Sequence, residues 1–136
     1  MKNSKSLLIT MALTLIVSVS LMAQPELKVI AVLNKADWCP VCRAHDKRAI
    51  PALIEINTDG AVKFVVYDQS NDQTTEKTAE DLKTVGLEHA IEKHDGAGMV
   101  SFFNYKTKAY ISQISFAESN DKLTEALNLA KKSVKK

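Results

Sequence analysis

The run from Leu27 to Leu33 is almost entirely apolar, contains three β-branched residues and is only seven residues long. Successive residues of a strand point to opposite faces, and here apolar residues occupy both odd-numbered and even-numbered positions. A segment of this length and pattern is typical of a strand that is buried on both faces. Such strands occur in sheets that helices cover on both sides. The run therefore predicts a central parallel strand of an α/β structure.

The chain after this run alternates helix and strand patterns. A helix is expected to begin near Cys39, with Pro40 in its first turn and Asp37 as its cap, and to end in a turn at residues 57–60. Its apolar residues have helical spacing: Val41, Ala44, Ile50, Leu53 and Ile54. The later segments predict a strand, a helix, a hairpin and a last helix: Val62 to Tyr67, Thr75 to Val85, Val100 to Tyr105 with Ala109 to Ile114, and Asn120 to Ala130. The order β-α-β-α-β-β-α predicts one α/β domain with a central mixed sheet flanked by helices.

The first 25 residues have the pattern of an export signal. Lys2 and Lys5 precede 20 residues without a charge, residues 6–25. This pattern predicts a signal peptide over residues 1–23 and a mature domain over residues 24–136, in the periplasm or secreted. Because about 20 apolar residues also suffice to span a bilayer, an uncleaved membrane anchor formed by residues 6–25 is the alternative.

The charge of the mature domain is balanced. The chain has 18 Lys and Arg residues and 16 Asp and Glu residues, and two of the lysines lie in the leader. Nucleic-acid proteins carry a clustered basic excess, so we expect no nucleic acid as a partner. The 136 residues leave room for one domain, which is expected to be a monomer without a cofactor.

The only two cysteines, Cys39 and Cys42, lie three residues apart at the predicted start of a helix. Three residues make nearly one helical turn, which puts both sulfurs on one face and close enough to close a small disulfide ring. The first cysteine also faces unpaired backbone N–H groups and the positive end of the helix dipole, which stabilise a thiolate. We therefore expect Cys39 to be the nucleophile that forms a mixed disulfide, and Cys42 to be the resolving thiol.

The segment Ala36-Asp37-Trp38-Cys39-Pro40-Val41-Cys42 resembles the active-site segment of the thioredoxin superfamily, in which Trp precedes Cys-x-x-Cys. The resemblance extends, as a pattern, over residues 27–136. It implies a thioredoxin-like fold and a thiol-disulfide oxidoreductase that acts outside the cytoplasm, more as a reductase than as an oxidase. It also implies disulfide-containing proteins as substrates and a membrane thiol-disulfide protein as electron donor. Four residues would surround the redox pair, with Trp38 covering Cys39: Asp37, Trp38, Pro40 and Val41.

Three departures from the family pattern bear on the site. Where the family has a cis-proline facing the disulfide, this chain has Gly96-Ala97-Gly98-Met99, of which Ala97, Gly98 and Met99 are expected to line the substrate groove. Where the family buries an acid and a lysine, the matching positions hold Leu33 and Phe64, so the proton of the resolving thiol must pass to water, to Asp37 or to another group. Residues 88–95 resemble an insertion that adds a helical turn at the edge of the groove.

Two other classes of function are compatible with these residues. Two thiolates that no proline covers could bind copper, or could bind zinc or an iron–sulfur centre across a dimer, although metal chaperones usually carry Met rather than Trp before the first cysteine. The second class is a non-enzymatic interaction domain with an inert disulfide. A loose cluster of metal-ligand residue types has a spacing that fits no defined metal site: His89, Glu92, His94 and Asp95.

Overall fold

The computed structural model describes residues 24–135 and contains within them four strands, three α-helices and one 3₁₀ turn. The elements follow the predicted order, which confirms the α/β class, and the predicted signal peptide lies outside the described residues. In chain order the elements are β1 (Val29–Lys35), α1 (Pro40–Glu55), β2 (Val62–Asp68), α2 (Asp72–Thr84), the 3₁₀ turn η1 (Ile91–Lys93), β3 (Met99–Asn104), β4 (Tyr110–Ser115) and α3 (Asn120–Ser133).

The four strands form one mixed sheet in the order β2-β1-β3-β4. β1 runs parallel to β2 and antiparallel to β3, and β3 runs antiparallel to β4. Each of residues 29–33 in β1 is at most 1% exposed. The predicted central strand, buried on both faces and paired with a parallel neighbour, is therefore confirmed.

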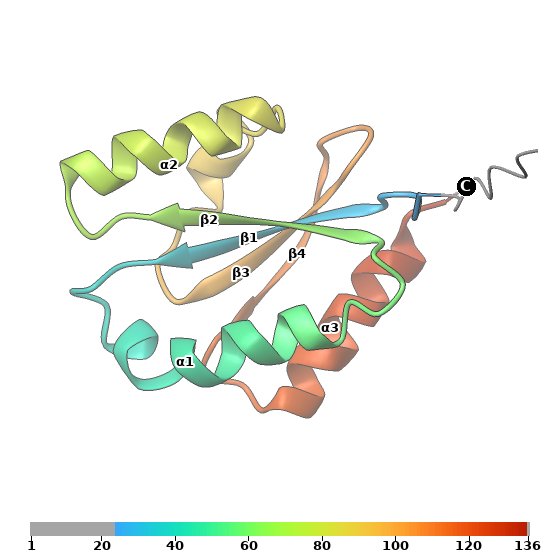
Figure 1. Cartoon of the computed structure of the whole chain (residues 1–136), viewed down its shortest axis with the longest axis horizontal. Coiled ribbons are helices and arrows are strands. Elements are labelled where there is room, and N and C mark those ends of the chain that lie inside the picture. Colours follow the sequence, from blue (N-terminus) through green and yellow to red (C-terminus); the bar gives the residue numbers. More distant parts are fainter. Residues whose placement is uncertain (1–23, 136) are drawn as a thin grey trace, which may run out of the picture.

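Helices cover both faces of the sheet. α1 and α3 lie on one face, and α2 lies on the other (Figure 1). Alternate residues of β1 serve the two sides, because successive side chains of a strand point to opposite faces. Ala31 and Leu33 belong to the core beneath α1 and α3. Ile30 and Val32 belong to a second core with Leu82 of α2.

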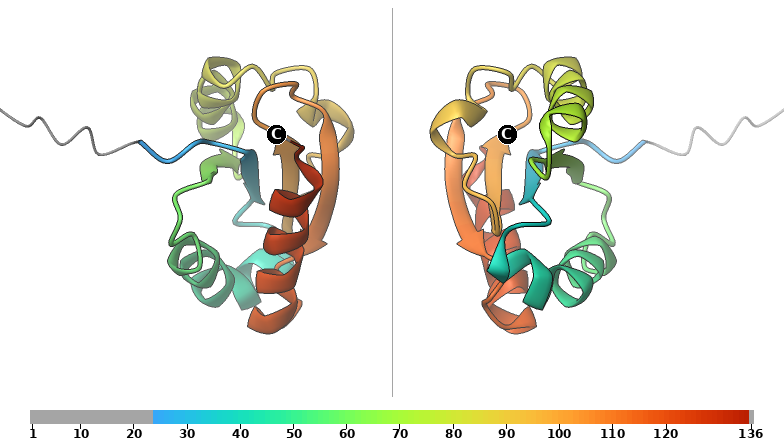
Figure 2. Two further views of the ribbon diagram at one scale, coloured as in Figure 1. Left: turned by 90° about the vertical axis from the view of Figure 1, so that its right-hand side faces the viewer. Right: turned by 90° about the vertical axis from the view of Figure 1, so that its left-hand side faces the viewer.

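The two parallel strands end at the same end of the sheet, where the β1–α1 and β2–α2 connections lie together (Figure 1). The chain enters β3 at this end, and it leaves β4 there toward α3 (Figures 1 and 2). The first described residues and the end of α3 lie at the opposite end of the strands (Figure 1). Four connections that are distant in sequence are thus gathered at one end of the molecule.

Two helices differ from the sequence-based expectation. α2 begins at Asp72, three residues before the predicted start, because Asn71 and Thr74 accept each other's backbone N–H groups in a capping box. α1 buries Cys42, Ala49 and Leu53. Two residues of its predicted apolar set are exposed instead: Ala44 and Ile54. The buried face of α1 is therefore rotated relative to the predicted one.

Candidate functional site

The first turn of α1 is built around Cys39. This residue has the extended backbone of an N-cap, with φ −81° and ψ 118°, and its Sγ accepts the backbone N–H of Cys42 at 3.2 Å. Pro40 is the first residue of the helix, where its missing N–H costs no hydrogen bond. The predicted cap, Asp37, is wrong: its backbone N–H donates to Ser70 Oγ at 2.9 Å, in the loop before α2. The cap falls to Cys39 because only its side chain reaches the free N–H groups.

The two cysteines are free thiols that differ in depth. Cys39 is 4% exposed and Cys42 is 1% exposed. The pKa of the Cys42 thiol is raised from 9.0 to about 11, mainly by burial and also by its hydrogen bond with Cys39, while the backbone at Ala36 acts in the opposite direction. A thiol with such a pKa stays protonated near neutral pH. The geometry therefore favours Cys39 as the sulfur that reacts first.

Trp38 presents its ring to solvent next to this pair. Its side chain is 62% exposed, yet its indole N–H donates to the carbonyl oxygen of Gln69 at 2.9 Å. With the bond from Asp37 to Ser70, the β2–α2 loop holds the segment before Cys39 at two points. Trp38 is thus an exposed aromatic surface with a fixed orientation.

Gly98 lies beside Cys39 of the cysteine pair. A Cβ atom at this position would stand 3.3 Å from Cys39 Sγ and 3.0 Å from the Cβ of Val41. Its φ of +89° lies in the region that glycine adopts at little cost. Its N–H donates to the carbonyl oxygen of Asn34, and its own carbonyl oxygen accepts the N–H of Phe116, both at 2.8 Å. The described residues contain no cis peptide bond. Beside Cys39, Gly98 contributes only its backbone.

The structure therefore brings together several of the residues that the sequence singled out. Val41 and Gly98 contact each other beside Cys39, while Pro40 and Asp37 are exposed nearby. Ala97 and Met99 flank Gly98 and are half-buried. Ala97 also packs against the core cluster that contains both cysteines.

A buried polar residue, Asn34, anchors the segment that carries Gly98. Its Nδ2 donates to Ser101 Oγ at 3.1 Å, to the carbonyl oxygen of Met99 at 3.2 Å and to that of His94 at 3.3 Å. Among the described residues its Oδ1 is buried without a hydrogen-bond partner. Asn34 is not predicted from the sequence, because a polar residue after Leu33 is typical of the end of a strand. The alternation of core-facing positions along β1 continues through Asn34, and this pattern indicates a buried side chain there.

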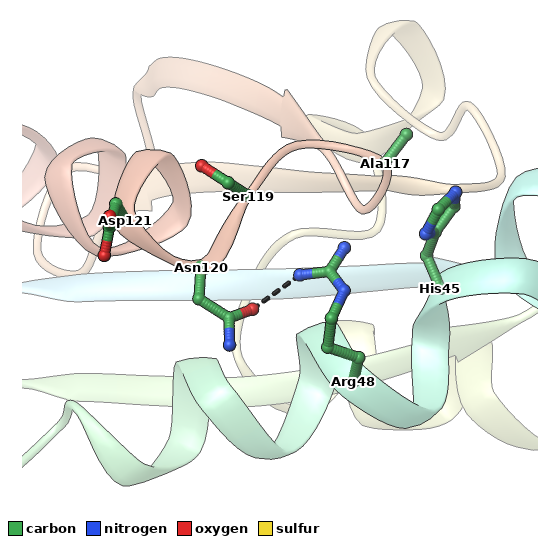
Figure 3. Close-up of a pocket in the computed structure, with 6 residues that line it drawn as sticks. All are labelled: His45, Arg48, Ala117, Ser119, Asn120 and Asp121. Atoms are coloured by element: carbon green, nitrogen blue, oxygen red, sulfur yellow. Dashed lines mark hydrogen bonds between the residues drawn. The ribbon is translucent and has the colours of Figure 1, made fainter.

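Arg48 of α1 holds the connection between β4 and α3, to which Gly98 is bonded. Its guanidinium donates to the carbonyl oxygens of Phe116 and Glu118 at 2.7 and 3.0 Å, and to the side chain of Asn120 (Figure 3). Because Phe116 is bonded to Gly98, Arg48 links α1 to the backbone that covers Cys39. An open hollow of about 460 Å³ lies beside it, lined by His45, Arg48, Ala117, Ser119, Asn120 and Asp121.

The acid on the first core strand that the family pattern would supply is not present. Leu33 is buried in the same core cluster as both cysteines, and Phe64 packs against this cluster. A different carboxylate lies near Cys42: Asp46, one helical turn further along α1, whose charge also raises the pKa of Cys42. The sequence analysis missed Asp46, although its spacing of four residues from Cys42 was a usable signal.

The segment over residues 88–95 contains η1, which confirms the predicted helical turn. His89 and Glu92 form an exposed pair at 3.8 Å, and the ring of His94 stacks on that of Tyr110 with centroids 3.6 Å apart. Within residues 24–135 no three His, Cys, Asp or Glu side chains converge as a metal site would require. In the same part of the chain, no helix combines the length and the apolar character needed to cross a membrane.

Comparison with known proteins assigns no family to this chain. No family model matches the sequence, and no curated protein matches it. The structure supports a coarser description: a small α/β domain with one mixed four-stranded sheet and a closely spaced cysteine pair, an arrangement compatible with a thioredoxin-like fold.

Proposed function

We propose that the protein is a thiol-disulfide oxidoreductase with a thioredoxin-like fold, acting on disulfide-containing proteins. One observation carries this proposal: Cys39 caps α1, and its sulfur accepts the backbone N–H of Cys42. A hydrogen bond from a helix N-terminus stabilises a thiolate more than a thiol, and the thiolate is the nucleophile in disulfide exchange.

The exchange proceeds in two steps. In the first, the Cys39 thiolate attacks one sulfur of the substrate disulfide, so that a mixed disulfide forms and the other substrate sulfur leaves as a thiolate. In the second, Cys42 loses its proton and attacks Cys39 Sγ, so that the Cys39–Cys42 disulfide forms and the first substrate sulfur leaves as a thiolate. The substrate gains two electrons, and the protein loses them.

The surface around Cys39 suits a polypeptide substrate. Trp38 offers an exposed aromatic ring on one side, and Gly98 offers backbone without a side chain on the other. An extended chain could approach the sulfur along the backbone of Gly98, because glycine has no side chain that would block it.

We further propose that the protein works outside the cytoplasm, as a monomer and as a reductase. The expected leader, residues 1–23 or an anchor over residues 6–25, supports the location. Because the bacterial periplasm is kept oxidising, a reductase there needs a membrane thiol-disulfide protein as its electron donor.

The reduction potential of the Cys39–Cys42 pair tests the proposal. Trp38 is the only tryptophan of the chain, so its fluorescence reports the redox state through a series of dithiothreitol and glutathione buffers. A reversible transition near about −250 mV or lower would support a reductase, and one near about −120 mV would make the protein an oxidant. If no reversible transition occurs at any buffer ratio, the proposal is wrong.

A further inference from the structure

One face of α1 carries a stripe of residues that points toward the core. Its members follow one another at intervals of three or four residues, the spacing that places side chains on one face of a helix: Cys39, Cys42, Asp46, Ala49 and Leu53. All of them except Asp46 are buried, and Asp46 is half-buried. A carboxylate therefore occupies a position in α1 that is otherwise apolar.

Asp46 lies one helical turn after Cys42 on the same face of α1, close enough for its charge to act on the Cys42 thiol. Side chains of an α-helix tilt toward its N-terminus, so a residue covers the turn that precedes its own Cα. Residues four apart are neighbours on the helix surface, about 5 to 6 Å apart at their Cβ atoms. Asp46 forms no ion pair with any described residue, so its carboxylate is not committed to another partner.

The resolving step of the proposed function needs a proton acceptor near Cys42. With a pKa of about 11, only about one Cys42 thiol in ten thousand is ionised at pH 7. The first core strand offers no base here, because Leu33 lies in the same buried cluster as the two cysteines. Cys42 is only 1% exposed, so a side chain from another element is better placed than bulk water to accept its proton.

We infer that Asp46 accepts the proton of Cys42 in the resolving step. This inference rests on the proposed function. The Cys42 S–H bond breaks and its proton passes to the Asp46 carboxylate, the Cys42 sulfur forms the bond to Cys39 Sγ, and the Cys39–substrate disulfide bond breaks. The electron pair of that bond leaves with the substrate sulfur, and Asp46 later returns its proton to solvent.

Other titratable groups around Cys42 are less well placed. His45 lines the hollow beside Arg48 (Figure 3). Asp37 is exposed in the loop that Ser70 holds. On the elements packed against α1, Glu118 pairs with Lys122 at 3.0 Å and Asp121 lies in the first turn of α3. The basic neighbours on α1, Arg43 and Lys47, are exposed.

The two steps can be measured separately with the aromatic disulfide dithiobis(nitrobenzoate), mixed with the reduced protein in equimolar amounts. Attack by Cys39 releases the first coloured thiolate, and attack by Cys42 on the mixed disulfide releases the second. In the Asp46→Asn variant we expect an unchanged first phase and a second phase about 100-fold slower, the size of effect typical of a lost general base. Raising the pH toward 11 should restore the second phase, because Cys42 then ionises without help.

Two further variants complete the test. Asp46→Glu keeps a carboxylate and should retain most of the second phase, whereas Glu55→Gln removes an exposed carboxylate from the end of the same helix and should change neither phase. If Asp46 acted only through its charge, Asp46→Asn would lower the pKa of Cys42 and accelerate the second phase.

A second phase in Asp46→Asn that is equal to or faster than that of the unsubstituted protein would therefore overturn the inference. An unchanged first phase in the same trace reports that the fold and Cys39 are intact. The unsubstituted protein tests the proposed function separately: if it releases no second thiolate, the oxidoreductase proposal fails whatever the variants do.

Discussion

Gly98 lies so close to Cys39 that a Cβ atom added to this glycine would be 3.3 Å from the Cys39 sulfur. The backbone at Gly98 is held from both sides, by the carbonyl oxygen of Asn34 and by the N–H of Phe116. The distance between this segment and the sulfur is thus set by β1 and by the loop that follows β4. Substitutions at either contact should affect the surroundings of Cys39.

Gly98→Ala should destabilise the protein by about 1 to 3 kcal/mol, because the φ of +89° is strained for alanine and because the new Cβ would press on Val41. Urea denaturation measures the loss. Gly96→Ala is the matched control, since a Cβ there would meet Met99 Cγ at an ordinary 3.7 Å. Equal denaturation midpoints for the two variants would contradict the packing of Gly98 described above.

The two cysteine variants should fail in different ways. Cys39→Ser should lose disulfide exchange entirely, because the capping sulfur is the nucleophile of the proposed first step. Cys42→Ser should still form the mixed disulfide but should not resolve it, so that substrate remains covalently attached and is seen on a non-reducing gel. Exchange activity in Cys39→Ser would show that the roles of the two cysteines have been reversed.

The stability of the reduced protein should fall in alkaline solution. The Cys42 thiol has a pKa of about 11 in the folded protein and an ordinary value of 9.0 when exposed, so between these pH values the unfolded chain releases a proton that the folded protein retains. The contribution of the Cys42 thiol to the free energy of unfolding is fully present below pH 9.0. It decreases by roughly 2 kcal/mol as the pH rises to about 11.

Chemical denaturation of the reduced protein at a series of pH values measures this slope. The oxidised protein, whose two sulfurs cannot titrate, is the control for all groups other than the two cysteines. An identical dependence on pH in the two redox states would contradict the assignment to Cys42.

Asn34→Ala should destabilise the fold by about 1 to 3 kcal/mol, because it leaves the carbonyl oxygen of Met99 and the buried Ser101 hydroxyl with one hydrogen bond fewer. Hydrogen exchange should increase in the segment from His94 to Met99, which Asn34 holds. The exposed residue Asn128 provides a control, since Asn128→Ala removes an amide without buried partners. Unchanged exchange in that segment would show that Asn34 does not anchor it.

The sequence predicted the structural features that depend on residues close together along the chain. The apolar run before Asn34 gave a buried strand, and a cysteine followed by Pro40 gave the start of a helix, because both depend on local conformation and periodicity. The exact cap did not follow, since Asp37 and Cys39 are both chemically able to cap a helix. Only the structure shows that α1 begins at Pro40, which makes Cys39 the cap and leaves Asp37 two residues before it.

Asn34 and Asp46 show what local patterns do not reveal. The partners of Asn34 lie 60 to 67 residues further along the chain, so no local pattern indicates that they satisfy a buried amide. Asp46 is a charged residue among apolar positions, and a search for apolar periodicity passes over it. Polar groups on buried faces are recognised only when the packing around them is known.

The depth of Cys42 would also couple protons to electrons in the proposed reaction. Because this thiol keeps its proton up to a pH of about 11, each reduction of the Cys39–Cys42 disulfide takes up at least one proton with its two electrons. The midpoint potential should then fall by at least about 30 mV for each rise of one pH unit. The acidity of the surroundings would thereby set how readily this pair accepts electrons, with no change in the protein itself.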